Sequence, residues 1–505
     1  MVRSQIRGSK MQSLQALTER ALASPAYQNA IEWRDEWYTW GQLRHVAEQT
    51  RALLRATGAH PDAPIALLPR NYPGSVAAMF GIICESRNIV MIHVYQSSAG
   101  IARDTARLRP AAVVAMASDF TDEVRRGLTE LGIAGIAVDG LEARAVQGLE
   151  KSTIACQFRE GGPRFELLTS GTTGPPKQFA IGYDVLAEHM VGRNLFRTEA
   201  VADPRNMPPV FQYLSFSTIT GLYLVLPTLL HGIRITLVDR FNLPEWHAYI
   251  LRHRPSFAGL PPPAIQMILA ADVPVKDLSS LRYVGTGAAP LDRNLQRAFE
   301  ERYGIPILLA YGATEFGGPV AQMTYDLYRE WGKAKFGSVG RGFAGAQLRV
   351  VNPESGEPLP AGSEGILEVV SPRMGPGWIR TSDLAVIDSD GFVFVLGRAD
   401  GAINRGGFKL LPDDVERALQ SHPAVAAAGV VGIPDQRLGQ VPAAVVELDP
   451  RQPAPSISDL EAHLRQNVPA THVPVAWRFV EKLPYTNMMK TDRLALRRLF
   501  DADAA

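Results

Sequence analysis

The sequence predicts an α/β protein with a large N-terminal domain of several subdomains and a small α+β C-terminal domain. Its 505 residues exceed what one hydrophobic core usually organises, so two or more domains are expected. Short apolar runs alternate with helical patterns through most of the chain, which is typical of βα units and parallel-rich sheets. The last hundred or so residues carry helix and strand patterns of their own, and that is an ordinary domain size.

Two pairs of segments carry the βα prediction. The run IALLP at Ile65 precedes the helical pattern SVAAMFGII, and AAVVAMA at Ala111 precedes DEVRRGLTEL. A short apolar run followed by a helical period predicts a strand and its crossover helix. We therefore expect largely parallel sheets in the first part of the chain.

The pattern changes near Gln347. QLRVVNPESGEPLP, GILEVVSP and GFVFVLGR are short β-rich pieces separated by Gly, Pro and Asp turns, and they predict a small barrel-like or antiparallel part. A boundary follows in GRADG, so we assign an N-terminal domain to residues 1–399 and a C-terminal domain to residues 400–505. In the latter, DDVERALQSH and ISDLEAHLRQNV predict helices, whereas AAAGVVGI and PAAVVEL predict strands.

The charge composition limits the classes of binding partner that are expected. The formal net charge is +1, from 52 basic and 51 acidic residues, so no broad field exists to attract nucleic acid or an anionic membrane. Small-molecule partners are expected instead, and no nucleic acid.

Three further features of the sequence bear on the cellular compartment. The two cysteines, Cys84 and Cys156, form no CxxC pair, which argues against a disulfide scaffold and for a reducing cytoplasm. The N-terminus has no apolar stretch typical of a secretory signal. The longest apolar run, 221–230, has about half the ~20 residues of a membrane span and predicts a buried helix.

The sharpest local pattern is FELLTSGTTGPPKQFAIG, residues 165–182. A β-rich run leads into a loop of glycines, hydroxyls and one lysine, and a second β-rich run follows. Glycine lets a backbone approach a polyphosphate, hydroxyls donate hydrogen bonds to it, and lysine adds a positive charge. The spacing differs from GxxxxGK[ST], and a Gly/Ser/Thr loop taken alone is more often a plain linker.

Four other segments strengthen the phosphate interpretation. They are LLAYGATEFGG at 308–318, IRTSDLAVIDSDGFVFVLGRADG at 379–401, NRGGFKLLPDDVERAL from Asn404, and LPYTNMMKTDRLALRRL around Lys490. A tyrosine ring can stack on a base, and a carboxylate can hold Mg²⁺. Taken singly, such residues are ordinarily a core tyrosine, a turn aspartate or a solvated lysine. The occurrence of all the segments in this order along the chain favours one joint site.

Taken together, the segments resemble the adenylate-forming superfamily of acyl-CoA synthetases, peptide-synthetase adenylation domains and luciferases, over nearly the whole chain. The family pattern S/T-S-G-T-T-G-x-P-K matches residues 169–177, and Y-G-x-T-E matches residues 311–315. T-G-D becomes TSD at 381–383, G-R-x-D matches 397–400, and P-x-T-x-x-G-K-x-x-R matches 484–493. The resemblance is to an acyl- or aryl-CoA ligase most of all.

The resemblance implies ATP, Mg²⁺ and coenzyme A as cofactors, with roles for individual residues. Asp383 and Arg398 are expected on the ribose, Thr314 on the α-phosphate, and Glu315 on Mg²⁺. Lys490 is expected to bridge the attacking carboxylate and the α-phosphate. The remaining nucleotide-binding positions are Thr169, Ser170, Gly171, Thr172, Thr173, Gly174, Lys177, Gly287, Ala288, Ala289, Pro290, Tyr311 and Gly312.

Three further sets follow from the same resemblance. Asp400 corresponds to an interdomain hinge, and Gly406 and Gly407 to a tunnel for the pantetheine arm. The acid pocket is assigned to Gln212, Tyr213 and Thr286. Its neighbourhood is apolar and shows no Asp for an α-amino group, which favours an apolar acid over an amino acid.

The chain departs from the family pattern at five positions. Gln178 and Met489 stand where glycine is usual, Leu309 where an amide is common, Gln212 where a histidine or aromatic gate is usual, and Gly401 where a second acid is common.

The leading interpretation is thus an ATP-dependent carboxylic acid:CoA ligase acting through an acyl-adenylate and releasing AMP and pyrophosphate. The alternatives are an enzyme that only thioesterifies a supplied acyl-adenylate, a ligase that loads a carrier protein, and a catalytically silent binding protein. A carrier protein or a second copy of the chain is left open as a partner.

Overall fold

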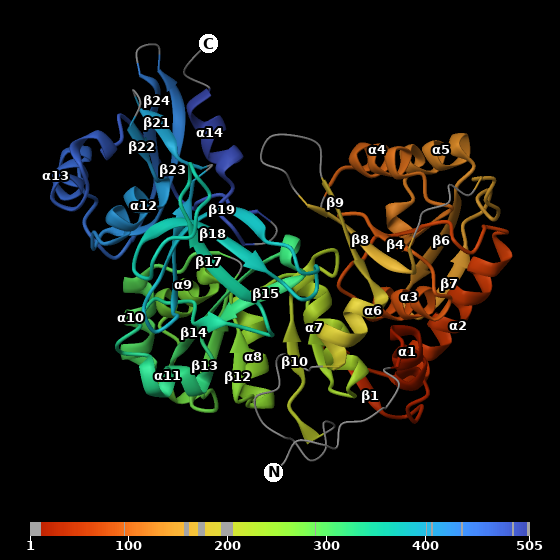
Figure 1. The fold of residues 1–505 in the computed structure, drawn as a ribbon. Coiled ribbons are helices and arrows are strands. Elements are labelled where there is room, and N and C mark those ends of the chain that lie inside the picture. Colours follow the sequence, from red (N-terminus) through yellow and green to blue (C-terminus); the bar gives the residue numbers. More distant parts are fainter. Residues whose placement is uncertain are drawn as a thin grey trace. The chain divides into compact units, whose positions relative to one another are not determined.

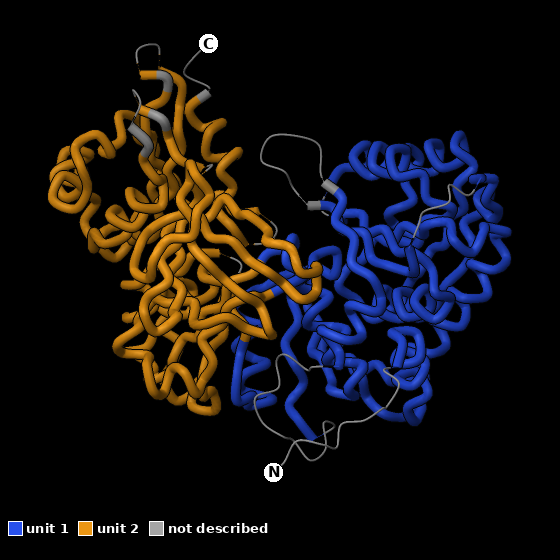
Figure 2. Tube along the Cα trace, in the orientation of Figure 1, with its two compact units in different colours: residues 1–258, 313–318 blue, residues 259–312, 319–505 orange. Residues whose placement is uncertain are grey.

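The computed structural model describes residues 12–94, 96–155, 161–169, 177–192, 206–287, 289–399, 401–405, 408–435, 438–486 and 489–501. The chain divides into two compact units, residues 1–258 with 313–318 and residues 259–312 with 319–505 (Figure 2). This division differs from the boundary at 399 and 400, which stays a prediction, and Asp400 lies outside the described residues. Within those residues, no helix has the length and apolarity to cross a membrane.

The largest sheet of the first unit has the strand order β7-β6-β5-β3-β4-β8-β9 (Figure 1). Neighbours from β6 to β8 run parallel, and β7 and β9 join the two edges antiparallel. The strands are β3 (Ile65–Leu67), β4 (Ile89–Met91), β5 (Ala112–Met116), β6 (Ala134–Asp139), β7 (Glu142–Ala145), β8 (Arg164–Thr169) and β9 (Lys177–Gly182).

Alternate side chains of this sheet enter two different cores. Ile65 and Leu67 pack in one core with α2 (Trp40–Ala56) and α3 (Pro73–Cys84). Ala66 faces the other core, with α4 (Ser98–Leu108) and α5 (Asp122–Leu131). A strand that is buried on both faces reads as a continuous apolar run. The predicted βα pairs at Ile65 and Ala111 are confirmed.

A second sheet of this unit has the order β10-β11-β1-β2. Its strands are β1 (Asn29–Trp33), β2 (Glu36–Thr39), β10 (Val210–Gln212) and β11 (Ile235–Leu237), and the other helices here are α1 (Leu14–Leu22), α6 (Tyr183–Val185), α7 (Ile219–Leu230) and α8 (Leu243–His253). The apolar run 221–230 lies in α7, almost wholly buried, so the predicted buried helix is confirmed.

The second unit contains a five-stranded sheet in the order β12-β13-β14-β15-β16 and an antiparallel sheet in the order β17-β18-β19-β20. The latter is open, with β17 and β20 at its edges, so the antiparallel prediction is confirmed and the barrel-like one is not. These elements are β12 (Phe257–Gly259), β13 (Tyr283–Thr286), β14 (Ile307–Ala313), β15 (Gly318–Gln322), β16 (Arg341–Gly342), β17 (Gln347–Val351), β18 (Glu364–Val370), β19 (Ile379–Ile387), β20 (Val393–Arg398), α9 (Pro262–Ala270), α10 (Arg293–Tyr303) and α11 (Tyr325–Trp331).

The C-terminal segments form a separate α+β layer. Ala428 and Val430 pack with α12 and α13 on one face of its sheet, whereas Ala427 and Val431 pack with α14 on the other. Gly429 makes room for α14, because a Cβ there would lie 2.4 Å from Leu496 Cδ1. The elements are β21 (Ile403–Arg405), β22 (Phe408–Leu410), α12 (Pro412–Gln420), β23 (Val425–Asp435), β24 (Gly439–Leu448), α13 (Ile457–Asn467), β25 (Ala476–Val480) and α14 (Arg493–Asp501).

Short 3₁₀ helices lie at Ala117–Asp119, Val275–Leu278, Thr314–Phe316 and Ala470–His472, and a π-helical segment at Leu186–Gly192.

Candidate active site

The predicted phosphate loop joins β8 and β9. These strands pair antiparallel, and Thr169 opposite Lys177 is their last pair. The predicted residues between them, Ser170, Gly171, Thr172, Thr173 and Gly174, lie outside the described residues. The described part of the two strands ends at this pair.

Gln178 belongs to a polar network in this hairpin. Its Nε2 donates to Glu166 Oε2 at 3.4 Å, and Arg164 Nε donates to Glu166 Oε1 at 3.1 Å. Glu166 is only 3% exposed, and a buried carboxylate needs such partners. The departure from glycine at Gln178 therefore has a structural use.

Thr314 and Glu315 lie in the 3₁₀ turn Thr314–Phe316 that follows β14. The next two residues, Gly317 and Gly318, have φ values of +65° and +121°, which favour glycine. The hydroxyl of Tyr223 on α7 donates to the carbonyl of Gly317. A Cβ at Gly318 would lie 2.6 Å from the Tyr223 ring, so α7 fixes the turn directly after Glu315.

The exposed Glu315 side chain suits Mg²⁺, which commonly binds one or two carboxylates together with substrate phosphates. Among the described residues, no cluster of three or more His, Cys, Asp or Glu side chains is arranged to hold a metal ion by itself. A metal here would depend on the nucleotide for its remaining ligands.

Tyr311 and Asp383 are brought together in the second unit. The Tyr311 hydroxyl donates to Asp383 Oδ2 at 2.5 Å. Burial, and then the charge of Asp383, hold the pKa of Tyr311 well above its usual value, so the hydroxyl keeps its proton. Because the residues are 72 positions apart, this pair joins two motifs that were predicted separately.

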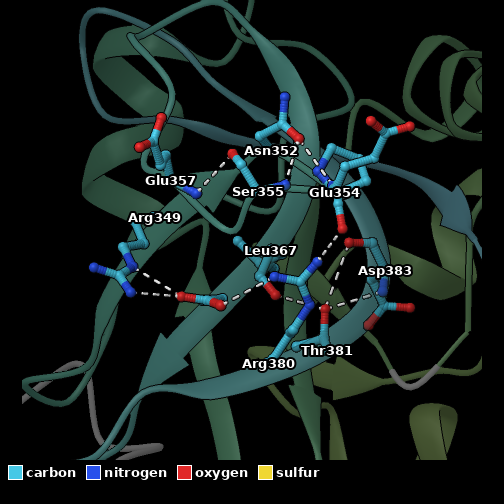
Figure 3. A network of polar contacts seen from close by, with 11 residues as sticks. Arg349, Asn352, Glu354, Ser355, Glu357, Leu367, Arg380, Thr381 and Asp383 are labelled. Carbon is cyan, nitrogen blue, oxygen red and sulfur yellow. Dashed lines mark hydrogen bonds and ion pairs between the residues drawn. The ribbon is translucent and has the colours of Figure 1, made fainter.

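Thr381 fixes the backbone at Asp383 (Figure 3). Its Oγ1 accepts from the Asp383 amide at 2.9 Å and donates to the Leu367 carbonyl of β18 at 2.8 Å. Local side-chain to backbone bonds of this kind fix a turn or bulge. The T-S-D motif contained Thr381, but only its aspartate was assigned a role.

Glu368 lies on β18 of the same sheet. It is 7% exposed and pairs with Arg349 of β17 at 2.7 Å and with Arg380 of β19 at 3.5 Å; Figure 3 labels both arginines. Opposite charges on neighbouring strands stabilise their register. The strand that carries Asp383 is thereby held in place.

Arg398 lies directly across from Asp383. The two residues are register partners in β19 and β20, and Arg398 Nη2 donates to Ser382 Oγ at 2.7 Å. Both predicted ribose-binding residues therefore belong to one cross-strand pair.

The GTGAAP segment adjoins the strand of Tyr311. Thr286 is the register partner of Leu309, and a Cβ at Gly287 would lie 2.9 Å from the Ala310 carbonyl oxygen. Only a glycine allows that approach without a shift of the backbone. Leu309 is 9% exposed and serves as a core side chain.

The other predicted residues of this segment follow Gly287. Ala289 and Pro290 come after it in the chain, Gly312 is in β14 beside Tyr311, and Ala288 lies outside the described residues.

Gln212 and Tyr213 lie at and just after the end of β10. Gln212 is fully buried and its Nε2 donates to the Leu214 carbonyl at 2.8 Å. Tyr213 stacks among aromatic rings, 6.2 Å from Phe211 and 5.5 Å from Phe241 between centroids, and burial raises its pKa. Phe211 and Tyr213 thus make the end of β10 aromatic, next to the buried Gln212 amide.

The next residues wrap tightly onto α7. Thr218 Oγ1 donates to the Ser215 carbonyl at 2.8 Å and accepts from the Gly221 amide at 3.1 Å. A Cβ at Gly221 would lie 2.1 Å from the same Ser215 oxygen. The residues that follow the predicted acid-pocket residues are thus closely packed against the start of α7.

Lys490 lies in a narrow turn of the C-terminal layer. Its backbone N–H donates to Thr486 Oγ1 at 3.2 Å, and its carbonyl accepts from the Thr486 amide at 2.7 Å. Met489 has φ +57°, which explains why glycine is usual at this position. Gly406 and Gly407 lie outside the described residues.

Most of the chain matches a known protein family. Residues 17–379 match the family described as AMP-binding enzyme, and residues 414–490 match the AMP-binding enzyme C-terminal domain. The chain belongs to the AMP-binding enzyme family. Of the two residues that the Tyr311–Asp383 hydrogen bond joins, Tyr311 lies inside the first match and Asp383 lies just beyond its end.

Individual relatives of this AMP-binding enzyme are CoA ligases. A 4-coumarate–CoA ligase-like protein of Arabidopsis thaliana is 28% identical over 58% of this chain, and the chain spans only 54% of that relative. A 2-succinylbenzoate–CoA ligase of Bacillus cereus is 26% identical over 96% of this chain and 98% of its own length.

Among solved structures, ATP-bound MatB from Rhodopseudomonas palustris superposes with a TM-score of 0.81 at 21% identity, covering 98% of this chain and all of that one. This likeness confirms the predicted fold class.

Proposed function

We propose that this AMP-binding enzyme is an ATP-dependent carboxylic acid:CoA ligase, which forms an acyl-adenylate and then an acyl-CoA, releasing pyrophosphate and AMP. The observation that carries the proposal is the pairing of Tyr311 with Asp383, because it joins an aromatic ring for a base to a carboxylate for ribose hydroxyls. CoA ligases among the relatives support the choice of acceptor.

Adenylation needs charge neutralisation. A carboxylate attacks an anionic α-phosphate, so positioning and positive charge must lower the barrier. Lys490 would supply that charge, Thr314 would bind the α-phosphate, and Glu315 would hold the Mg²⁺ that the phosphates carry. The phosphate loop from Thr169 to Lys177 would hold the β- and γ-phosphates.

The second step needs space for a thiol. Rotation at Asp400 would remove Lys490 after adenylation and bring Gly406 and Gly407 to the pantetheine arm. Coenzyme A would then attack the mixed anhydride. We place the reaction in the cytoplasm, with a carrier protein or a second copy of the chain as a further candidate partner.

The acid is proposed to be apolar. Gln212, Tyr213 and Thr286 would line its pocket, and the aromatic surroundings of Tyr213 support an acyl or aryl group. Gln178 and Leu309 depart from the family pattern, but both have structural uses in this protein. This favours the two-step ligase over the half-reaction specialist.

The deciding experiment is pyrophosphate exchange into ATP across a panel of fatty, aryl and amino acids, followed by addition of coenzyme A. Exchange with an apolar acid and thioester formation would support the ligase. Thioesterification of synthetic acyl-adenylate without exchange would favour the half-reaction specialist, and exchange with a thioester only on a carrier protein would favour the loading enzyme.

A further inference from the structure

The Lys490 turn is closed at its base by its own backbone. The amide of Asp492 donates to the Pro484 carbonyl at 2.9 Å, and Tyr485 and Thr491 form an antiparallel bridge. Together with the two bonds between Thr486 and Lys490, these contacts make residues 484–486 and 489–492 a small unit. The direction in which Lys490 projects therefore depends on how the two ends of this unit are attached.

The upstream end is attached to β24. The amide of Leu483 donates to Glu447 Oε2 at 2.8 Å, and the Leu483 side chain is buried in the core beneath α14. This end is held by one hydrogen bond to a carboxylate and by apolar contact.

Arg493 attaches the downstream end through three acceptors. Its Nη1 donates to the Val430 carbonyl at 2.7 Å and lies 3.0 Å from Glu416 Oε1, while its Nη2 donates to Asp413 Oδ1 at 2.7 Å. A planar guanidinium that binds several acceptors fixes both distance and angle. Arg493 is three residues after Lys490 and is the first residue of α14.

The carboxylates are largely shielded. The side chains of Glu416 and Asp413 are 15% and 20% exposed, and the amide of Val430 donates to Glu416 Oε1 at 2.8 Å. Burial first, and then the neighbouring charge of Asp413, raise the pKa of Glu416 to about 7, against the opposing effect of Arg493. The pKa of Tyr485 is raised to about 12 by burial and by the charges of Glu447 and Glu416.

We propose that Arg493, clamped by Asp413 and Glu416, is a positioning residue that aims Lys490 for the adenylation step. This inference rests on the proposed role of Lys490 in that step. A merely structural ion pair would stabilise the domain equally for both half-reactions. A positioning pair affects the step that uses Lys490 and leaves thiol attack on a ready-made adenylate unchanged.

The test compares Arg493→Lys with wild type in both half-reactions. Lysine keeps the charge but loses the fork, so we expect pyrophosphate exchange to fall about tenfold or more in kcat, with KM for ATP within about twofold. Thioesterification of synthetic acyl-adenylate should stay within about twofold. The matched control is Arg465→Lys, which alters an exposed pair with Glu461 in the same layer and should change neither rate.

Glu416→Gln supplies a readout that a structural role would not move. As Glu416 ionises between about pH 6 and pH 8, its hold on Arg493 strengthens, so the wild-type exchange rate should rise over that range more steeply than that of the variant. The neutral amide of the variant has no such transition.

Three outcomes would overturn the inference. Equal losses of both half-reactions in Arg493→Lys would indicate a structural role only, and unchanged exchange would remove any role. Parallel pH profiles for wild type and Glu416→Gln would also contradict it. Failure of the proposed function looks different: wild type itself would then show no exchange, or Lys490→Ala would exchange normally.

Discussion

The hydroxyl of Tyr311 and the carboxylate of Asp383 share a hydrogen bond of 2.5 Å, with Thr381 fixing the backbone of the aspartate. Asp383 is therefore ordered before any nucleotide arrives, and part of the conformational entropy of binding is already lost in the free enzyme. The same bond fixes the position of the Tyr311 hydroxyl. A base and a ribose would meet two side chains already in a defined arrangement.

Replacement of Asp383 by alanine tests this arrangement. We expect ATP affinity to weaken by about 1–3 kcal/mol, because the ribose loses a charge-assisted hydrogen bond. Titration calorimetry measures the change. Tyr311→Phe, which keeps the ring and the carboxylate, should lose less, and equal affinity in wild type and Asp383→Ala would refute the assignment.

Separate half-reactions test the proposed alternation. Lys490→Ala should lose adenylation by about two orders of magnitude, the scale of one well-placed electrostatic group, and should keep thioesterification. Gly407→Trp should do the reverse, because its side chain would obstruct the pantetheine arm. Single-turnover kinetics of each step would show this, and equal losses in both steps for both variants would exclude such alternation.

The turn at Met489 makes a prediction about backbone conformation. A φ of +57° disfavours a β-branched residue, with a penalty of about 1–2 kcal/mol. Met489→Ile should therefore slow pyrophosphate exchange about tenfold, whereas Met489→Gly should retain it. If the two variants exchange at the same rate, the left-handed turn is not needed for Lys490.

Gly318 tests the link between α7 and the turn of Glu315. Alanine there combines φ +121° with a Cβ 2.6 Å from the Tyr223 ring, so we expect a destabilisation of about 2 kcal/mol or more. Thermal unfolding measures it. Gly377→Ala is the control, because nothing lies within 4 Å of its added Cβ; similar melting temperatures for both variants would contradict the packing described.

Local pattern predicted much of this fold. The order of apolar and polar residues predicts the βα pairs at Ile65 and Ala111 and the buried helix at 221–230. This order is a local property of neighbouring residues in the sequence. The open edge of the β17–β20 sheet did not follow, because closure depends on strand tilt and register rather than on composition.

The pairs that shape the candidate site were not predictable in the same way. Tyr311 contacts Asp383 across 72 residues, Tyr223 contacts Gly317 across 94, and Arg493 contacts Asp413 across 80. Each motif indicated its chemistry, but no local spacing indicated which distant residue would hold it. For this reason, the segment DDVERALQSH, which contains Asp413 and Glu416, predicted a helix and nothing more.

One consequence concerns α7. Its first turn is packed onto Ser215, next to the proposed acid-pocket segment, and its Tyr223 holds the turn that carries Glu315. On the proposed assignment, an acid that displaces this segment also displaces the metal-binding carboxylate. Discrimination between acids would then appear in turnover more than in binding: an ill-fitting acid would occupy the enzyme as an inhibitor instead of being refused at entry.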